Sequence, residues 1–261
     1  MIVKTRAVVL REVKYRDQSK IVTLYTREFG RLSAILKGAR NPKSRLAGIF
    51  TAGNVLDTIL YQRPEREVQL VSDASLVSCP MSAGADIERF GVLYALIDLV
   101  RRSTGHDGGN PRLFALVEST LLELNREGAA YRRLHAWFLL RFISLEGFAP
   151  ELSRCVLSGR GLSEAAGDNE LLFVMNPGGL ALRGSAHPDG RNITAVPVGA
   201  ARLLCRLERT ATAAEAAAGG KETETEHAGL CGTILHAYCR HHLEDAGPDR
   251  SLAVISRLLS E

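Results

Sequence analysis

The apolar residues of this 261-residue chain change their period near Cys79-Pro80. From Val3 to about Ala74 they form short runs rich in Val, Ile, Thr and Tyr, broken by polar or glycine-bearing turns, and this pattern is typical of strands. Beyond residue 80 they recur every three or four residues, which is typical of helices. The change predicts a small β domain followed by a largely helical region.

The β part contains enough strands to close on itself. Phe29-Gly30 marks a tight hairpin between the second and third strands, and Gly38–Arg45 is expected to be an exposed basic loop before the fourth. Five short strands within about 75 residues suit a small closed barrel of the OB type, a scaffold that often binds single-stranded nucleic acid. The predicted strands are Thr5–Val13, Lys20–Thr26, Arg31–Leu36, Val55–Tyr61 and Glu67–Val71.

The helical part is interrupted by an insert. Residues 147–192 lose the helical spacing, and Leu171–Val174 followed by Asn176–Leu180 predicts a small β-hairpin there. The low-complexity stretch Thr210–Gly220 is expected to be a mobile surface loop. The predicted helices are Ile87–Val100, Leu113–Leu124, Leu134–Leu145, Val198–Arg209, Thr223–Leu243 and Ser251–Leu259.

These elements predict an α+β protein of several domains. We expect an OB-fold nucleic-acid-binding domain at residues 1–80 and a helical domain made of residues 81–150 and 193–261. A zinc-finger-like β-hairpin insert is expected at residues 151–192. Five cysteines are an odd number and favour reduced thiols, and no run approaches the roughly 18 apolar residues of a membrane span, so we expect a cytoplasmic protein.

Positive charge is concentrated at the N-terminus. The first 45 residues hold 12 Lys or Arg against three acids, a local charge of 12 − 3 = +9, whereas residues 46–261 carry 21 − 26 = −5. Such a concentration is typical of a surface that binds a nucleic-acid backbone. The alternative is that these residues only keep the barrel soluble and protect its strand edges. The candidate DNA-binding residues are Arg16, Lys20, Arg27, Arg31, Lys37, Arg40, Lys43 and Arg45.

Three tyrosines of the barrel have both a functional and a structural interpretation. Tyr15, Tyr25 and Tyr61 are candidate platforms on which bases could stack. Alternatively, Tyr25 and Tyr61 plug the barrel, since each belongs to a predicted strand.

The third predicted helix offers a candidate protein-binding site. Arg132, Arg133 and Arg141 surround the apolar residues Trp137 and Phe138. An acidic peptide tail that ends in apolar residues needs a pocket for its side chain and a guanidinium for its carboxylate. An ordinary core helix with solvated arginines has the same sequence, so both interpretations stay open.

Signatures of enzymes and of metal sites are weak or absent in the sequence. There is no Gly-x-x-x-x-Gly-Lys-Ser/Thr, Gly-x-Gly-x-x-Gly, His-Glu-x-x-His or Gly-x-Ser-x-Gly motif. His227, Cys231 and His242 share one face of a predicted helix, but the last two are about 16 Å apart, too far for one ion.

Three groups of segments are more specific. Asp17–Leu32, with the sequence DQSKIVTLYTREFGRL, is continued by Leu36–Arg40 and by Lys43-Ser44. Phe138-Leu139-Leu140 leads into Glu146–Pro150 and then Cys155, and Leu235–Cys239 is followed by Leu243 and Ser251. These segments resemble the bacterial RecO family of recombination mediators, and the resemblance spans nearly the whole chain.

The resemblance implies a DNA repair and homologous-recombination mediator of the RecF pathway that is not an enzyme and needs no cofactor. Such a protein binds single-stranded and double-stranded DNA and anneals single strands. It works with RecR to load RecA onto strands coated by single-strand-binding protein, whose acidic C-terminal tail it binds, and it acts in the cytoplasm at the nucleoid. An OB-fold RNA-binding module, a metal-dependent nuclease and a structural adaptor remain as alternatives.

The chain departs from the family at a zinc module. Many members carry two Cys-x-x-Cys pairs, of which the first would begin at Cys155, but the position three residues on is Ser158. The segment where the second pair would lie, residues 180–185, contains no cysteine. A lone thiolate cannot supply the four ligands of a structural zinc site, so Cys155 is at most a remnant ligand. We expect a metal-free hairpin held by Leu171, Phe173 and Leu180.

Overall fold

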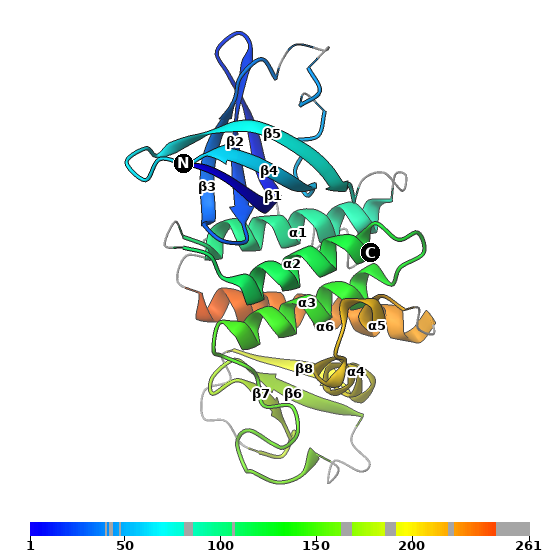
Figure 1. The fold of residues 1–261 in the computed structure, drawn as a ribbon. Coiled ribbons are helices and arrows are strands. Elements are labelled where there is room, and N and C mark those ends of the chain that lie inside the picture. Colours follow the sequence, from blue (N-terminus) through cyan, green and yellow to red (C-terminus); the bar gives the residue numbers. More distant parts are fainter. Residues whose placement is uncertain are drawn as a thin grey trace. The chain divides into compact units, whose positions relative to one another are not determined.

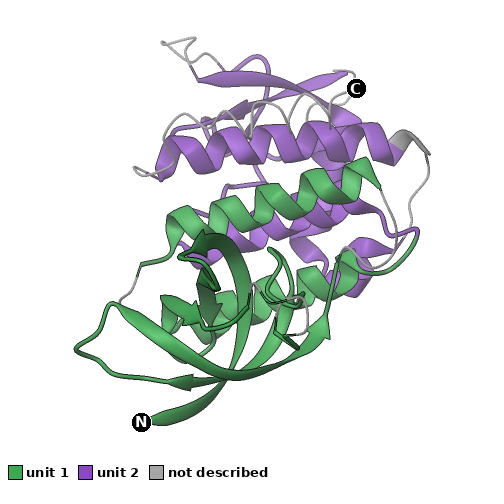
Figure 2. Ribbon diagram, turned by 90° about the horizontal axis from the view of Figure 1, so that it is seen from above, with its two compact units in different colours: residues 1–127 green, residues 128–261 purple. Residues whose placement is uncertain are grey.

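The computed structural model describes residues 1–39, 41, 44–46, 48–80, 86–105, 108–162, 169–185, 192–218 and 222–243 (Figure 1). The chain falls into two compact units, residues 1–127 and residues 128–261 (Figure 2). The predicted helix Ser251–Leu259 lies outside the described residues, as do Arg40 and Lys43. Among the described residues, no helix is both long enough and apolar enough to cross a membrane.

Unit 1 begins with a closed barrel, which confirms the predicted OB-type architecture. Around the barrel the order is β1-β2-β3-β5-β4, in which β3 and β5 run parallel and every other neighbouring pair is antiparallel. Closure gives the edge strands partners within the chain. The strands are β1 (Ile2–Tyr15), β2 (Ser19–Thr26), β3 (Gly30–Leu36), β4 (Val55–Tyr61) and β5 (Val68–Ser78).

The prediction for β5 was too short, because the strand ends at Ser78 and not at Val71. The ladder between β4 and β5 shifts register between Ile59 and Leu60, so the alternation of buried and exposed residues is interrupted there. Such an irregularity hides the second half of a strand from a search for period-two alternation.

The barrel core is built from alternate strand residues. In β3, for example, Leu32, Ala34 and Leu36 are buried inside, while Ser33 and Ile35 face outward and are half-buried. The connection between β3 and β4 packs against the same core. In the predicted basic loop Gly38–Arg45, Ala39 is buried, whereas Asn41 and Arg45 are exposed as expected, and Phe50 beyond the loop is buried as well.

Two helices complete unit 1. α1 (Ile87–Ser103) begins at Asp86 and α2 (Pro111–Leu124) begins at Asn110, and each of these two side chains accepts a hydrogen bond from a backbone N–H of the first helical turn. α1 packs against β1 beneath the barrel (Figure 1). The approach is close at Gly53, where a Cβ would lie 2.6 Å from Leu93 Cδ1.

The barrel and α2 also share an aromatic contact. The rings of Tyr25 and Phe114 have centroids 5.8 Å apart. Unit 1 therefore extends past the barrel to the end of α2. The predicted assignment of residues 81–150 to one helical domain stays a prediction.

Unit 2 combines helices with a small sheet. α3 (Tyr131–Leu145) packs against α6 (Glu222–His242), and α4 (Val198–Arg209) packs against α6 as well. β6 (Glu170–Val174) pairs with β7 (Gly179–Ala181), which confirms the predicted hairpin, and with β8 (Ile193–Pro197). Sequence analysis missed β8 because this short strand runs directly into α4 without a turn residue between them.

The prediction of a mobile loop at Thr210–Gly220 is wrong for its described part. Residues Ala213–Ala217 form the short helix α5, which begins at Thr212 and packs against α3. Ala213, Ala216 and Ala217 are buried. The low complexity of this stretch therefore reflects a close helix contact, which only small side chains allow.

Candidate nucleic-acid interface

The strand register gathers several predicted DNA-binding residues at one end of the barrel, which we call the open end. Tyr15 pairs with Ser19 across the β1–β2 hairpin, and Lys20 pairs with Leu36, the last residue of β3. The hairpin tip and Lys37 therefore lie next to each other. Figure 1 shows the tip pointing away from α1. The connection that holds Arg40, Lys43 and Arg45 starts at the same end.

Charges at the open end are exposed and only weakly neutralised. Lys14 and Lys37 are exposed and form no ion pair with a residue that the structure describes. Arg16 is exposed and its guanidinium lies 5.2 Å from the centroid of the Tyr15 ring. Its φ of 50° places a non-glycine residue in the left-handed region, a strain of roughly 1–2 kcal/mol that is more frequent at functional sites.

Two other open-end cations have acidic partners. Lys20 Nζ lies 2.6 Å from Glu12 Oε2, and Arg45 Nη2 lies 2.6 Å from Asp73 Oδ1. The hydrogen bond from Arg45 lowers the pKa of the Asp73 carboxyl. Because the Arg45 side chain is 78% exposed, this pair is screened by water, and a phosphate could replace the carboxylate at little cost.

At the opposite end of the barrel, which we call the helix end, a cation is used in an internal contact. Arg31 donates a hydrogen bond to the Arg101 carbonyl at the end of α1, so it joins the barrel to that helix. Arg27 lies exposed in the β2–β3 turn, at the far end of β2 from Lys20. At about 3.3 Å per strand residue, some 23 Å separates the two. Arg27 and Arg31 therefore do not join the open-end group.

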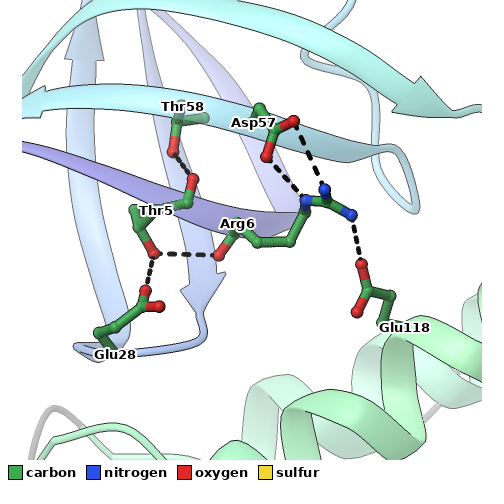
Figure 3. Close-up of polar contacts among 6 residues, drawn as sticks. All are labelled: Thr5, Arg6, Glu28, Asp57, Thr58 and Glu118. Atoms are coloured by element: carbon green, nitrogen blue, oxygen red, sulfur yellow. Dashed lines mark hydrogen bonds and ion pairs between the residues drawn. The ribbon is translucent and has the colours of Figure 1, made fainter.

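Arg6 of β1, which was not a candidate, shows the same internal use of charge (Figure 3). Its Nε lies 2.8 Å from Asp57 Oδ1 and its Nη1 lies 2.6 Å from Glu118 Oε1 of α2. Hydrogen bonding to Asp57 and then to Glu118 raises the pKa of Arg6. The local charge of +9 in the sequence therefore overstates the charge that a ligand can reach.

The three candidate tyrosines also differ in how far their rings are exposed. Tyr25 is 1% exposed and packs on Phe114, so it has no ring face to offer a base, and the structural interpretation holds for it. Tyr15 is half-buried beside Arg16. Tyr61 is 43% exposed at the end of β4.

Sequence analysis missed the turn between β4 and β5. Its Arg63 and Arg66 are exposed, and buried Gln69 holds the turn by accepting from the Arg63 N–H at 2.7 Å and donating to the Arg63 and Arg66 carbonyls at 3.0 and 2.6 Å. Glu65 and Glu67 offset the charge of the two arginines. The turn and β3 line a cavity of about 590 Å³. The sequence does contain a sign of this basic turn, since Arg63 and Arg66 flank Pro64 between two predicted strands.

In unit 2, the candidate tail-binding residues have internal partners. Trp137 is 3% exposed and its Nε1 donates to the Thr210 carbonyl at 2.9 Å, so the predicted Trp137 pocket is not open. Arg141 donates to the Glu208 and Thr210 carbonyls, and Arg133 donates to the Ala218 carbonyl. These carbonyls end α4 and α5, where a cation is favourable. Arg132 is half-buried on α3.

Comparison with known proteins agrees with both halves of the chain. Residues 1–80 match the family model for the N-terminal part of recombination protein O, and residues 84–252 match the model for its C-terminal part. The chain belongs to the RecO family. Similar RecO relatives include the DNA repair protein RecO of Chlorobium luteolum, 69% identical over 100% of both chains, and that of Chlorobium limicola, 50% identical over 100% of both. The RecO protein of Pelodictyon phaeoclathratiforme is 48% identical over 99% of both.

Membership of the RecO family gives the chain a role in DNA repair and recombination. The insert is the place where the RecO resemblance suggests a zinc module, and its Cys155 is the residue at which the first ligand pair would begin. The Cys155 Sγ accepts hydrogen bonds from the Ser158 and Leu182 backbone N–H groups, each at 3.4 Å, and lies 3.4 Å from the Ser185 hydroxyl. The backbone of Leu182 and the side chain of Ser185 thus face the sulfur from the segment where the second Cys-x-x-Cys pair was expected.

This donor set does not fit zinc. One thiol, two hydroxyls and a leucine cannot form a tetrahedral site of nitrogen and sulfur ligands. Burial opposes ionisation of Cys155, but the hydrogen bonds from Ser158, Ser185 and Leu182 together outweigh it and lower the pKa to about 6. The same sulfur therefore holds the two loops together by hydrogen bonds. Leu171, Phe173 and Leu180, the residues expected to hold the hairpin, are buried.

Proposed function

We propose that this chain is a non-enzymatic mediator that binds single-stranded DNA at the open end of its barrel and anneals complementary strands. One observation carries the proposal. The register of β1, β2 and β3 brings Lys14, Arg16 and Lys37 to one end, exposed to solvent, whereas Arg6 and Arg31 are used in internal contacts. Exposed cations at a hairpin tip and at a strand end can contact the backbone of a flexible single strand.

The proposed mechanism is charge neutralisation without base readout. Lys and Arg side chains on the phosphates release counterions and reduce the repulsion between two strands. Base pairing then occurs between the strands themselves, so the protein supplies proximity and not chemistry. Each phosphate contact on a single strand is expected to contribute about 0.7 to the slope of log affinity against log salt.

The proposal includes partners that act in the RecF pathway. We infer that the protein works with RecR to help load RecA onto strands coated by single-strand-binding protein, at the nucleoid, and that it also binds double-stranded DNA. For the acidic tail of single-strand-binding protein, α3 remains the candidate site. The contact would not use a pocket at Trp137, and a tail bound by Arg132, Arg133 and Arg141 would have to compete with the carbonyl groups that Arg133 and Arg141 already contact.

An annealing assay tests the proposal. Complementary strands coated with the cognate single-strand-binding protein should anneal faster with the wild-type chain, and failure to accelerate would contradict the main function. Replacing Lys37, Arg40, Lys43 and Arg45 together with Ala should lower both DNA affinity and its salt slope. An unchanged slope would place the DNA elsewhere. Adding RNA of the same sequence as a competitor, and incubating DNA with magnesium or manganese, distinguishes the RNA-binding and nuclease alternatives.

A further inference from the structure

One row of outward-facing residues on the barrel is apolar across four strands. The ladders pair Val13 with Ile21, Ile21 with Ile35, and Ile35 with Leu70. We call these four residues, one each from β1, β2, β3 and β5, the aliphatic row. Leu70 pairs in turn with Tyr61 of β4. Strand spacing of about 4.8 Å gives the row a length of roughly 14 Å.

The aliphatic row lies on the outer surface. Successive residues of β2 point to opposite faces of the strand. Val22, next to Ile21, belongs to the buried core, so Ile21 faces out. The same alternation on β3 places Ile35 outside. Val13 is 45% exposed, and Ile21, Ile35 and Leu70 are half-buried by their neighbours. Packing of α2 on Tyr25 covers the outer face at the helix end of β2.

Apolar residues in register on an outer face, one exposed and three half-buried, need a reason, because a monomer seldom leaves a large continuous apolar patch in water. The surroundings of the row indicate the partner. Lys37 directly follows β3, two residues beyond Ile35, and Arg11 lies two residues before Val13 on β1, so a cation lies on each side of the row. Thr23 and Ser33, which pair with each other beside the row, are small and uncharged.

Acidic side chains near the row are few at the open end. Glu12 is paired with Lys20, Asp73 is paired with Arg45, and Asp17 is exposed in the hairpin turn. At the Leu70 end, Glu65 and Glu67 balance the two arginines of the β4–β5 turn. The charge around Val13, Ile21 and Ile35 is thus positive, which complements a phosphate backbone.

We propose that the bases of a bound single strand lie on the aliphatic row while its phosphates contact Lys37 and Arg11. This proposal rests on the proposed function and adds the base-contacting surface to it. The strands and loops of an OB barrel that face its ligand commonly provide aromatic rings, and stacking on a ring holds a base roughly 5- to 150-fold more tightly than a surface without one. The four residues of the aliphatic row carry no ring, and the exposed ring of Tyr61, which pairs with Leu70, lies at one end of the row.

The aliphatic row therefore holds bases weakly and without sequence preference. Apolar contact covers the flat face of a base but forms no hydrogen bond with its pairing edge. A second strand can then pair with the first while the first is still bound. A row of aromatic residues would bind single strands more tightly and release them more slowly for pairing.

Ile35→Trp tests the proposal directly. Trp137 is the only tryptophan of the chain and is 3% exposed, so a new tryptophan at position 35 reports on its own surroundings. We expect oligo-dT to quench the fluorescence of the introduced tryptophan and to bind the variant about 5-fold or more tightly than it binds the wild type. The variant should also anneal oligo-dT to its complementary strand more slowly than the wild type does. Inorganic polyphosphate, which has charge but no bases, should not quench it. Leu76→Trp, at an exposed position of β5 outside the row, is the matched control and should change none of these.

Ile21→Ser provides an independent test if a tryptophan is not tolerated. It should weaken oligo-dT binding about 3- to 10-fold without changing the salt slope, because it removes apolar contact and no cation. Wild-type binding with no effect of either row variant would overturn the base-contact proposal and leave the proposed function intact. No wild-type binding at low salt would overturn the proposed function itself. Loss of self-association, with DNA binding unchanged, would assign the row to a second copy of the chain.

Discussion

The open end of the barrel and the insert of unit 2 use polar residues in opposite ways. At the open end, Lys14 and Lys37 point to solvent without an acidic partner among the described residues. In the insert, the donors around Cys155 are turned toward its sulfur and satisfy one another. Both regions carry residues that mark a site in the sequence. Only the open end leaves its polar groups available to a ligand.

The comparison teaches that residue type alone does not identify a site. A cation has a strong attraction for a distant ligand only where no nearby carboxylate or carbonyl already satisfies it. Arg6 and Lys37 are both part of the basic N-terminal segment, yet Arg6 bridges Asp57 and Glu118 while Lys37 is exposed. The pairing of each charge decides between a structural and a binding role.

The largest expected effect comes from returning metal ligands to the insert. Ser158→Cys, Leu182→Cys and Ser185→Cys together would give four thiols with Cys155, and structural zinc contributes roughly 10–16 kcal/mol in small domains. We expect the triple variant to bind one zinc ion per chain, measured by release with a thiol reagent. Ser158→Cys with Ser185→Cys alone, which leaves Leu182, should bind more weakly. A folded triple variant that takes up no zinc would show that the loops have diverged from the metal geometry.

Removing the exposed cations at the open end should have the next largest effect. Lys14→Ala, Arg16→Ala and Lys37→Ala together should weaken binding of single-stranded DNA roughly 10- to 100-fold near 0.1 M salt and reduce the salt slope by about 2. Fluorescence anisotropy at several salt concentrations measures both. Arg27→Ala at the helix end is the matched control. An equal loss with Arg27→Ala would remove the distinction between the two ends.

Arg6→Ala should affect stability and not DNA binding. The variant leaves Asp57 and Glu118 without their cation, and because these side chains are about one-third exposed or less, water replaces part of the lost interaction. We expect a loss of about 1–2 kcal/mol in the free energy of unfolding, read from urea denaturation. A fall in DNA affinity at matched salt would mean that Arg6 also reaches the ligand.

The pH dependence of stability tests the description of the insert. Folding lowers the Cys155 pKa from 9.0 to about 6, so the folded state binds the proton less tightly than the unfolded state. The stabilisation is complete above about pH 9, declines as the pH falls and is absent below about pH 6. The difference in melting temperature between wild type and Cys155→Ser should therefore increase from pH 6 to pH 9. A constant difference would show that the sulfur stays a neutral thiol.

Sequence periodicity predicted the regular elements well because each has its own apolar pattern. All five barrel strands and the α4 boundaries at Val198 and Arg209 are of this kind. The errors arise where tertiary contacts override the local pattern. The register shift near Ile59 obscures the end of β5, and burial of Ala213 turns an apparent loop into a helix.

The candidate site was predictable only in part. Local sequence shows that Arg16 and Lys37 are basic, but their adjacency depends on strand register. It cannot show that Phe114, some 90 residues later, covers Tyr25 and removes it from the interface. Likewise, the pairing of Ser185 with Cys155 depends on the fold of the insert.

The contacts of Arg6 and Tyr25 with α2 decide where the chain can be cut. The N-terminal family match ends at residue 80, but Glu118 and Phe114 lie beyond it. A fragment of residues 1–80 would expose the Tyr25 ring and lose one of the two carboxylates that hold Arg6. We expect the smallest independently folding piece to be residues 1–127. The module that can be recognised by sequence is thus shorter than the module that can be inherited, moved or expressed as a stable protein.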